Sequence, residues 1–361
     1  MKIAFLIQDI STDGGTERTT CCLAEEMVRR GHTVSIVSVF HNQATPHYQA
    51  EGAHCIFLTE QSYTLRENTL NRFLRARRTV SAVRTCKALQ EADVILCQKI
   101  AASYMAWQAG FAAKAIACEH YRYGMYNTPI RWLRKKLYGR MRAVVTLTEN
   151  DRASFMREGL HEVYCIPNMV SIRPLPYQGK NSRRIVSVGR LTRQKGYDLL
   201  LQAIAMIADE MGDYYVEIYG DGEDRKQLET QSLQLGIDQR VHFCGYTSSI
   251  EQVYADSAIY ILSSRFEGFP MVLLEAAAAG VPIVSFDCPE GAGVLLRNGG
   301  GLLVEPENVA ALSQALLRMI CEPELREQCH NSTSRIIAPY SPEKIGERWE
   351  SLLRNLIKQQ I

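Results

Sequence analysis

The feature that most constrains this chain is a regular alternation between short apolar runs and helical patterns. The first run, KIAFLIQ at residues 2–8, is almost continuously apolar, which is typical of a strand buried on both faces of a sheet. The helical pattern that follows ends at Gly31, where a glycine commonly closes a helix. The next apolar run, at residues 32–40, is again strand-like. Strands that alternate with helices in this way predict a parallel sheet with helices on both faces.

The alternation stops once, at residues 166–184, and then starts again with the strand-like run RIVSVG. This interruption, IPNMVSIRPLPYQGKNSRR, holds three prolines and has little periodicity, which is typical of a linker. A chain of 361 residues is also long enough for about two domains. We therefore predict an α/β protein with two doubly wound domains of similar size, residues 1–170 and residues 171–341, followed by one amphipathic helix.

The composition limits where the protein acts and which cofactors it needs. The chain has no signal-peptide pattern and no stretch near the roughly 20 apolar residues that cross a bilayer. Its 11 cysteines are scattered, without CxxC pairs and without the cysteine and histidine spacing of zinc sites. We therefore expect a cytoplasmic protein with reduced thiols and no metal centre.

Basic residues gather in the first half of the chain. Residues 1–175 carry 23 Lys and Arg against 15 Asp and Glu, whereas the remainder carries 18 against 24. Two segments, 65–87 and 129–142, are especially basic, and the second predicts a helix with an apolar face and an exposed basic face that includes a tryptophan. The apolar face is Ile130, Leu133, Leu137 and Met141, and the exposed set is Arg131, Trp132, Arg134, Lys135 and Lys136. This pattern is typical of an anchor on an anionic membrane surface, with a merely solvated face as the alternative. No recognised nucleic-acid-binding module is present.

Two carboxylates flank the start of a predicted buried helix in RFEGFPMVLLEAAAAG, residues 265–280. A strand ends just before this stretch, so we expect Glu267 in a loop at the carboxyl end of the sheet, where ligands bind in such folds. Pro270 suits the first helical position, and free amides around Met271 would form an anion site. Glu275 lies five residues inside the predicted helix among leucines and alanines, which disfavours a solvated position. We favour a ligand-binding pair over a pair of acids that only cap or form salt bridges.

Two cations directly follow a strand in the stretch VGRLTRQKG. Arg190 and Lys195 lie in the predicted loop between that strand and the next helix, and Gly189 and Gly196 allow the backbone to approach a ligand closely. The planar fork of arginine and the point charge of lysine suit a diphosphate. A solvated basic loop is the alternative interpretation.

The first domain offers two further candidates at the ends of strands. In DGGTER, Gly14 and Gly15 would let the backbone pack against a ligand, although the dinucleotide fingerprint GxGxxG is absent and a plain tight turn is the alternative. His120 ends the strand-like run AIACEH. A single histidine is often structural, but its place at the carboxyl edge of the sheet favours a functional role.

Together, these motifs resemble the GT4 family of retaining glycosyltransferases. The stretches GGTER, EH, GRLTRQKG, GDGE, VHFCGY and FEGFPMVLLEAAAAGVPIV occur in the family's order and spacing over essentially the whole chain. The resemblance implies the GT-B fold, in which two Rossmann-like domains face a cleft and the closing helix, 342–361, crosses back to the first, acceptor-binding domain. The chain is most similar to bacterial members that build O-antigen, capsule or lipid-linked oligosaccharide. One departure is Met169, where relatives often have glycine.

The resemblance also implies roles for the motif residues. Glu275 would bind the ribose hydroxyls of the nucleotide, and Glu267 would hold hydroxyls of the transferred sugar. Arg190 and Lys195 would neutralise the leaving diphosphate, and His120 would contact the 6-position of the sugar. The residues implied in catalysis are His120, Glu267, Arg190 and Lys195, and those implied in binding the nucleotide sugar are Gly15, Gly189, Arg190, Lys195, Gly245, Tyr246, Glu267, Gly268, Phe269, Pro270, Met271, Val272 and Glu275.

We therefore expect transfer of a hexosyl or N-acetylhexosaminyl unit from a UDP-sugar, with retention at the anomeric carbon and without a metal ion or cofactor. Gly15 would approach the donor phosphates, and Gly245 with Tyr246 would pack on the base. Two cations and a helix N-terminus would stabilise the leaving phosphate, and no DxD pair is present to hold Mg²⁺. The acceptor would be lipid-linked or a polysaccharide at the inner face of the cell membrane. The alternatives are a sugar-nucleotide epimerase or phosphorylase of GT-B fold, and a non-catalytic nucleotide-sugar-binding protein at the membrane surface.

Overall fold

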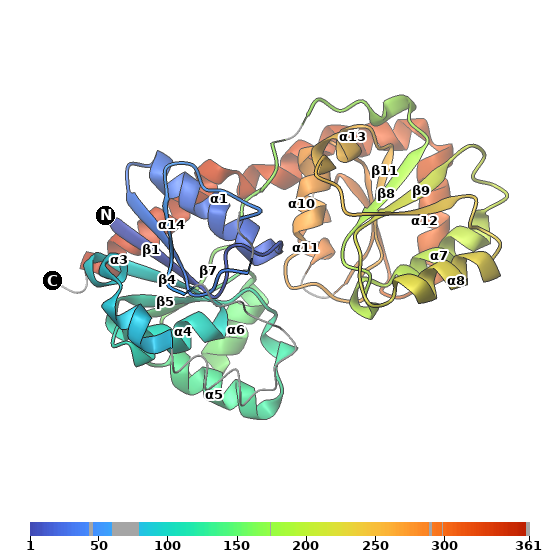
Figure 1. The fold of residues 1–361 in the computed structure, drawn as a ribbon. Helices are drawn as coiled ribbons and strands as arrows, with labels where there is room; N and C mark the ends of the chain where they lie inside the picture. The colour runs from blue at the N-terminus through green and yellow to red at the C-terminus, as the bar shows by residue number, and fades with distance from the viewer. Residues whose placement is uncertain (43–45, 60–78, 174, 289–290, 298, 359–361) are drawn as a thin grey trace. The chain divides into compact units, whose positions relative to one another are not determined.

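The computed structural model describes residues 1–42, 46–59, 79–173, 175–288, 291–297 and 299–358. The chain divides into two compact units, Met1–Met169 with Ser341–Ile361 and Val170–Tyr340. Each unit is a parallel β-sheet enclosed by helices (Figure 1). Most of the basic segment 65–87 lies outside the described residues. Within the described residues, no helix has the length and apolar character needed to cross a bilayer.

The first unit is built on a sheet whose described strands have the order β3-β2-β1-β4-β5-β6-β7. Their bounds are β1 Lys2–Ile7, β2 Thr33–Ser38, β3 His54–Phe57, β4 Val94–Gln98, β5 Ala115–Cys118, β6 Ala143–Thr146 and β7 Val163–Cys165. All of these strands pair in parallel. Their carboxyl ends therefore lie at one edge of the sheet, and every loop that follows a strand begins there.

The two faces of this sheet are covered by different helices. Successive residues of a strand point to opposite faces, so Ile3 and Phe5 of β1 pack in one cluster while Ala4 and Leu6 pack in another. The first face is covered by α1 Gly15–Arg29 and α14 Pro342–Lys358, and the second by α3 Lys87–Glu91, α4 Lys99–Gln108, α5 Thr128–Tyr138 and α6 Glu149–Arg157. Burial on both faces explains why the strands read as continuous apolar runs.

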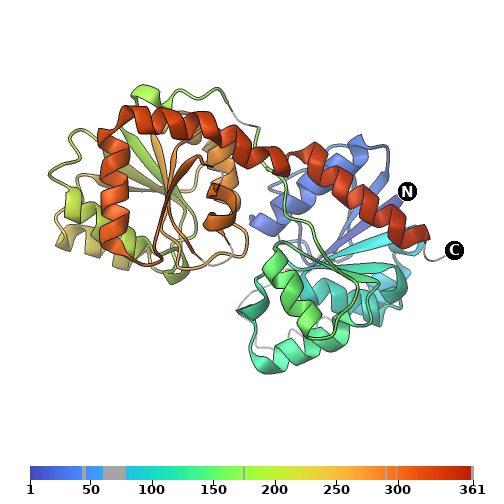
Figure 2. The ribbon, with the colours of Figure 1, turned by 180° about the vertical axis from the view of Figure 1, so that it is seen from behind.

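The closing helix α14 is fixed to α1 by charge as well as by packing (Figure 2). Glu26 of α1 is buried and accepts hydrogen bonds from Arg29 and Arg30, and Arg30 also forms an ion pair of 3.1 Å with Glu350 of α14. A Cβ atom on Gly346 of α14 would overlap with Arg30 and Glu26. The first unit thus takes its last helix from the end of the chain.

The second unit repeats the layered plan with the strand order β10-β9-β8-β11-β12-β13 among its described residues. The strands are β8 Arg184–Val188, β9 Tyr215–Tyr219, β10 Val241–Gly245, β11 Ile259–Leu262, β12 Ile283–Phe286 and β13 Gly301–Val304. One face carries α7 Tyr197–Ile207, α8 Arg225–Gln234 and α12 Val309–Cys321, and the other carries α9 Ile250–Ala255, α10 Met271–Ala278 and α11 Ala292–Leu296. The remaining helix, α13 Pro323–Ile337, packs along α10 and α12.

Two predictions of helix geometry are wrong. The helix α10 begins at Met271, and Pro270 precedes it with a ψ of 84°, which is outside the helical range. In α5, Leu133 is 45% exposed instead of facing the core, whereas Arg134 is fully buried instead of exposed. Met141 lies beyond the end of α5 at Tyr138. The segment does form a helix, as predicted. The residues that face the core differ from the prediction because Arg134 forms a buried ion pair with Glu119.

Candidate active site

A lysine and a glutamate meet at the carboxyl edge of the second sheet. Lys195 lies in the loop that follows β8, and Glu267 lies in the loop that follows the neighbouring strand β11. The Lys195 Nζ and Glu267 Oε1 atoms are 2.8 Å apart, and the Ser264 hydroxyl donates to the same oxygen at 2.5 Å. Glu267 is only 5% exposed, and Gly268 and Phe269 complete the turn between it and α10. The contact joins two predicted site residues and holds the carboxylate in one orientation.

A second ion pair joins the same two loops. Arg265 donates two hydrogen bonds of 2.8 Å to the Asp198 carboxylate and a third to the carbonyl of Arg193. The hydrogen bond with Arg265 lowers the pKa of Asp198, and the same contact raises the pKa of Arg265. Because Asp198 belongs to α7, this pair fixes the start of that helix close to Lys195.

Glycines allow these loops to touch. Gly196 has a φ of 65°, and a Cβ atom there would overlap with the carbonyl of Ser263. Gly222, in the loop after β9, is packed in the same way against the carbonyl of Leu191. A side chain at either position would push the loops apart. The last glycine of GRLTRQKG and the second glycine of GDGE therefore set the spacing of the loops at this edge.

Glu275 is buried inside α10, which confirms the prediction from its apolar neighbours. Its carboxylate accepts hydrogen bonds from the Ser171 hydroxyl at 2.9 Å and from the Tyr254 hydroxyl at 3.3 Å. Ser171 belongs to the segment 166–184, and Tyr254 belongs to α9, so three separate parts of the unit meet at this group. Both acids of the stretch 265–280 are thus buried and hydrogen bonded.

The start of α10 offers fewer free amides than predicted. The amide of Met271 donates to the carbonyl of Phe269, and the amide of Leu273 donates to the carbonyl of Pro270. Val272 is the residue of this turn whose amide forms no hydrogen bond with the described part of the chain. The expected anion site is therefore reduced to one amide of the turn that opens α10.

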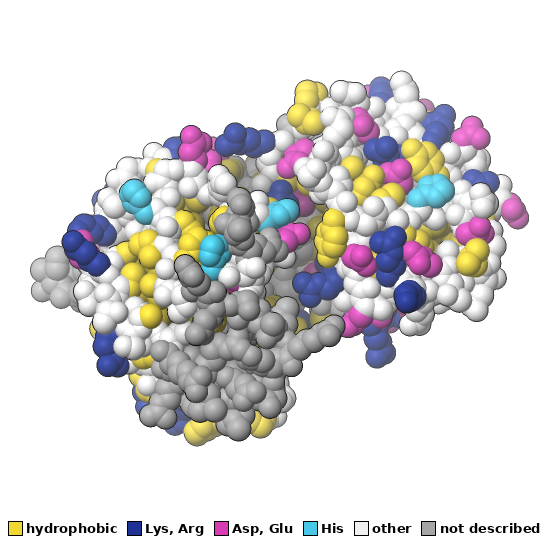
Figure 3. Space-filling model, in the orientation of Figure 1, with side chains coloured by type: hydrophobic (Ala, Val, Ile, Leu, Met, Phe, Trp, Pro, Cys, Tyr) yellow, Lys and Arg dark blue, Asp and Glu magenta, His cyan; other side chains and the backbone are white. Residues whose placement is uncertain are grey.

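The remaining predicted residues of the second unit do not join the contact between Lys195 and Glu267. Arg190 is exposed, and its guanidinium forms no hydrogen bond or ion pair with a described residue. The amide of Gly189 donates to the carbonyl of Tyr219 at 2.9 Å. Gly245 ends β10 with a φ of 70°, and the next residue, Tyr246, is 73% exposed. On the face shown in Figure 3, basic and acidic side chains are interspersed over this unit.

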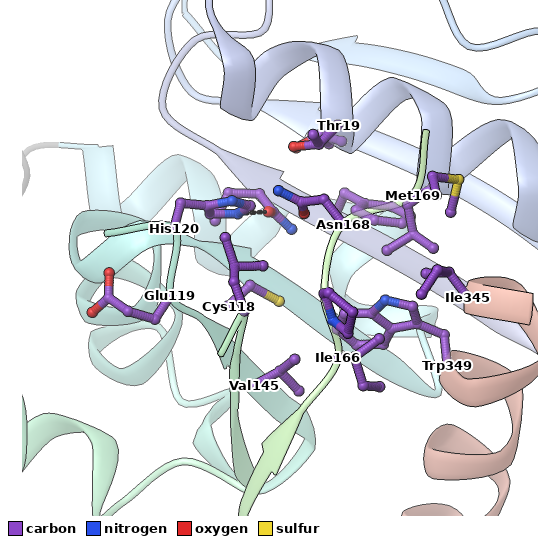
Figure 4. A pocket seen from close by; sticks show the side chains of 16 residues that line it. Thr19, Cys118, Glu119, His120, Val145, Ile166, Asn168, Met169, Ile345 and Trp349 are labelled. Carbon is purple, nitrogen blue, oxygen red and sulfur yellow. Dashed lines mark hydrogen bonds between the residues drawn. The ribbon is translucent and has the colours of Figure 1, made fainter. Parts of the chain in front are cut away.

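In the first unit, His120 lines a pocket at the carboxyl edge of the sheet (Figure 4). Its Nε2 atom lies 2.6 Å from Oε1 of Gln98, the last residue of β4. The amide nitrogen of Gln98 donates to the Leu96 carbonyl, so the amide oxygen is turned toward the imidazole. His120 therefore carries its proton on Nε2, and Nδ1 is the hydrogen-bond acceptor. Thr19 of α1 and Trp349 of α14 line the same pocket.

The His120 imidazole is kept neutral by its surroundings. Burial lowers its pKa to about 3, and the positive charge of Lys99 acts in the same direction. Lys99 opens α4 with a φ of 70°, which is uncommon for a residue that has a Cβ atom. The Lys99 ammonium lies 3.6 Å from the Glu17 carboxylate. A neutral imidazole can accept a hydrogen bond here, but it cannot supply positive charge.

The two glycines of GGTER have different tasks. A Cβ atom on Gly14 would overlap with the carboxylate of Glu17, which folds back toward the start of α1. At Gly15, by contrast, the position of a Cβ atom is open space. A side chain at Gly14 would therefore have to displace the end of the Glu17 side chain, whereas Gly15 is the position with room for another molecule.

Sequence patterns did not identify several residues of these two sites. Ser264, Arg265 and Asp198 hold the loops of the second unit, and Gln98 and Lys99 surround His120. All five lie at or near the boundary of a strand or helix at a carboxyl edge, which is the signal that could have found them. Among the residues that the structure describes, no group of three or more His, Cys, Asp and Glu is placed to hold a metal ion.

Comparison with known proteins assigns the chain to a family. The family profile of glycosyl transferases group 1 matches residues 176–336, and the profile of glycosyltransferase family 4 matches residues 13–173. An uncharacterized glycosyltransferase of Haemophilus influenzae is 30% identical over 98% of this chain and 99% of its own length. The amylovoran biosynthesis glycosyltransferase AmsD of Erwinia amylovora is 24% identical over 98% of this chain and 99% of its own.

The fold is shared with a solved structure of TarM from S. aureus, in complex with fondaparinux, α-GlcNAc-glycerol and UDP. The TM-score is 0.80 at 14% identity, with 98% of this chain and 100% of that chain covered. These findings give no support to an epimerase or to a non-catalytic binding protein. The chain therefore belongs to the GT4 family of glycosyltransferases and has the GT-B fold, as its motifs predicted.

Proposed function

We propose that this glycosyltransferase moves a hexosyl or N-acetylhexosaminyl unit from a UDP-sugar to a lipid-linked or polysaccharide acceptor in the synthesis of bacterial cell-surface glycans. The observation that carries the proposal is the contact between Lys195 and Glu267 at the carboxyl edge of the second sheet. The relatives support the class of product and donor, since AmsD is named for amylovoran biosynthesis and the TarM complex contains UDP.

The charges near this contact suit a departing nucleotide. Transfer from a UDP-sugar builds negative charge on the leaving diphosphate and positive charge on the sugar ring. Lys195 is partly buried and Arg190 is exposed, so both cations can turn toward a diphosphate. The Val272 amide adds a donor at the start of α10. Positive groups beside the leaving diphosphate stabilise the negative charge that develops on it in the transition state.

The two buried acids take different roles in this proposal. Glu267 binds hydroxyl groups of the transferred sugar, with Lys195 and Ser264 orienting its carboxylate. Glu275 binds the ribose hydroxyls at the carboxylate that Ser171 and Tyr254 contact. Neither acid is then free to act as a nucleophile. Retention of configuration, which the resemblance to GT4 enzymes implies, would then occur without a covalent intermediate. We infer that the acceptor attacks on the face from which the phosphate leaves, that the leaving phosphate accepts the proton of the acceptor, and that no metal ion takes part.

Loss of either partner of the central contact should abolish most of the transfer. In Glu267→Gln and Lys195→Met we expect turnover to fall about 10²- to 10³-fold, because each removes one preorganised charge from the transition state. Turnover is measured as label transferred from radiolabelled UDP-glucose, UDP-galactose or UDP-N-acetylglucosamine to a lipid-linked oligosaccharide extract from bacterial membranes.

The matched control is Lys180→Met, which removes a lysine from an exposed ion pair with Glu327 in the same unit. We expect this variant to transfer label at the rate of the unchanged protein. Full activity of both Glu267→Gln and Lys195→Met would contradict the assignment of the site.

The inferred mechanism predicts the behaviour of the product and of metal chelators. With an α-configured UDP-sugar, NMR of the purified product should show an α-glycosidic bond, because attack occurs on the face from which the phosphate leaves. Transfer should continue unchanged in excess EDTA. An inverted product would contradict retention, and activity that is lost in EDTA and restored by Mg²⁺ would contradict metal independence.

We propose that His120 contacts the sugar as a neutral hydrogen-bonding group. The low pKa that keeps its imidazole neutral also predicts how the stability of the fold depends on pH. Its pKa is about 3 in the folded state against 6.5 ordinarily, so the unfolded chain binds more protons between these values and stability falls as the pH falls. Lowering the pH from 7 to 5 should reduce the free energy of unfolding of the unchanged protein by about 2 kcal/mol more than that of His120→Gln. The free energy of unfolding is measured by urea titration at each pH. His161→Gln, at an exposed histidine of the same unit, should follow the unchanged protein. Identical pH dependence in all three would contradict the low pKa of His120 in the folded protein.

We also propose that α5 binds an anionic membrane surface. Trp132 is 63% exposed and is followed by exposed Leu133, with the ammonium of Lys136 lying 5.7 Å from the centre of the indole ring. Lys135 is exposed as well. An apolar pair beside cations suits the boundary between headgroups and acyl chains.

Vesicle flotation tests this surface directly. With vesicles that contain phosphatidylglycerol, we expect Trp132→Ser combined with Leu133→Ser to lower the floated fraction by about tenfold, because two apolar contacts are lost. Met156→Ser, at an exposed apolar residue of α6, is the control and should float like the unchanged protein. Equal flotation of all three proteins would contradict the proposal.

A further inference from the structure

A buried ion pair lies directly beside the pocket of the first unit. Glu119 precedes His120 at the end of β5, and Arg134 comes from the middle of α5. Both side chains are inaccessible to solvent, with Arg134 Nη1 3.3 Å from Glu119 Oε2. The hydroxyl of Tyr138 donates to the same oxygen at 3.1 Å. This is the tertiary partner that draws Arg134 into the interior.

The ion pair is a poor explanation of stability by itself. Burial raises the pKa of Glu119, and the charge of Arg134 offsets this only in part. The Nε atom of Arg134 is buried without a hydrogen-bond partner among the described residues. Replacing a buried ion pair with apolar residues of similar volume is often neutral or stabilising. A pair that is kept despite this cost calls for a role other than holding the fold together.

That role is visible in the hydrogen bonds to the loop between β5 and α5. The second oxygen of Glu119 accepts from the backbone amide of Tyr121 at 3.3 Å. Arg134 donates to the carbonyl of Tyr123 at 2.9 Å, and Asp151 of α6 accepts from the amide of the same residue at 2.7 Å. The loop is thus held at alternate residues by buried charged side chains.

Aromatic rings close the cluster around the guanidinium. The centres of the Phe155, Tyr123 and Tyr126 rings lie 4.6, 5.0 and 5.2 Å from the central carbon of Arg134. Two of these rings belong to the loop itself. A cation enclosed by rings in this way fixes their positions as well as its own.

His120 lies between the two fixed points of this loop. The amide of Glu119 donates to the carbonyl of Val145 in β6, and the amide of Tyr121 donates to the Glu119 carboxylate. The backbone is therefore held on both sides of His120. Figure 4 shows the result, since the His120 ring points into the pocket whereas the Glu119 carboxylate is turned away from it.

We propose that Glu119 and Arg134 are positioning residues, whose buried ion pair fixes the loop that presents His120 to the sugar. The inference rests on the proposed role of His120. Glu119 is among the residues that line the pocket, but its carboxylate is turned away from it, so the pair acts through the backbone of the loop and the aromatic rings around Arg134.

The test removes both charges together, because a single substitution would leave one charge buried and could unfold the protein. In Glu119→Gln combined with Arg134→Met, the glutamine oxygen can still accept from the Tyr121 amide. We expect the melting temperature to stay within about 4 °C of the unchanged protein. Turnover in the transfer assay should fall about 10²-fold, since a displacement of about 1 Å has an effect of this size. The KM for the UDP-sugar should stay within about twofold, because donor contacts of the second unit are unchanged.

A matched control comes from the second unit. Arg184 and Glu217 form an ion pair of 3.0 Å, and Glu217 also accepts a hydrogen bond from a tyrosine hydroxyl, that of Tyr219. Glu217→Gln combined with Arg184→Met therefore removes a partly exposed arginine–glutamate pair of the second unit. We expect this control to retain the turnover of the unchanged protein.

Histidine NMR provides a readout that needs no acceptor. The signal of ¹³C-labelled His120, assigned with His120→Gln, should not titrate between about pH 5 and pH 8 in the unchanged protein, because its pKa is about 3. In the Glu119 and Arg134 double variant, the loosened loop should expose the ring to water. Its pKa should then move up toward the ordinary value and bring the titration into this range.

The outcomes separate the two levels of the proposal. If His120→Ala transfers sugar at the unchanged rate, the role of His120 is wrong and the inference is overturned with it. If His120→Ala is inactive while the double variant keeps both full turnover and a His120 signal that does not titrate, only the positioning role is overturned. Loss of turnover with an unchanged melting temperature and a newly titrating His120 supports it.

Discussion

The parallel arrangement of the strands is the constraint on which both sites depend. In each sheet the strands that the structure describes all point the same way, so the loops that follow neighbouring strands begin side by side. Lys195 and Glu267 are 72 residues apart in sequence, yet they meet because β8 and β11 are adjacent in the sheet. Gln98 and His120 meet for the same reason at the ends of β4 and β5.

Concentrating charged groups at such edges is costly unless each charge has a partner. The structure meets this requirement in the second unit with two ion pairs that cross the same loops, one between Lys195 and Glu267 and one between Arg265 and Asp198. The pairs differ in kind. The second is bidentate and also includes a hydrogen bond to the backbone, whereas the first is a single contact between the Lys195 ammonium and one oxygen of Glu267. Arg190, exposed nearby, adds a cation that no described residue neutralises.

The sequence predicted features that depend on local pattern. The strands, the burial of Glu275 and the end of α1 two residues before Gly31 follow from runs of apolar residues and from glycine placement. The burial of Arg134 could not be predicted in this way, because it depends on Glu119, 15 residues earlier and on another element. The same holds for Gln98, whose function is visible only once the strand order places it beside His120. Local sequence patterns identify helices and strands. Contacts between side chains on different helices and strands can be identified only when the order of the strands in the sheet is known.

The helix α5 shows why charge counts along a sequence mislead about surfaces. Its cations form one basic segment in the sequence, but Arg134 is turned inward to Glu119 while the next two residues, Lys135 and Lys136, remain exposed. Successive residues of a helix point about 100° apart, so adjacent cations can serve opposite sides. One side presents Trp132 and cations to solvent, and the other organises the loop of the pocket. Removing all positive charges from this segment would therefore change both surface binding and the position of the loop that carries His120. Substitutions of single residues are needed to separate the two effects.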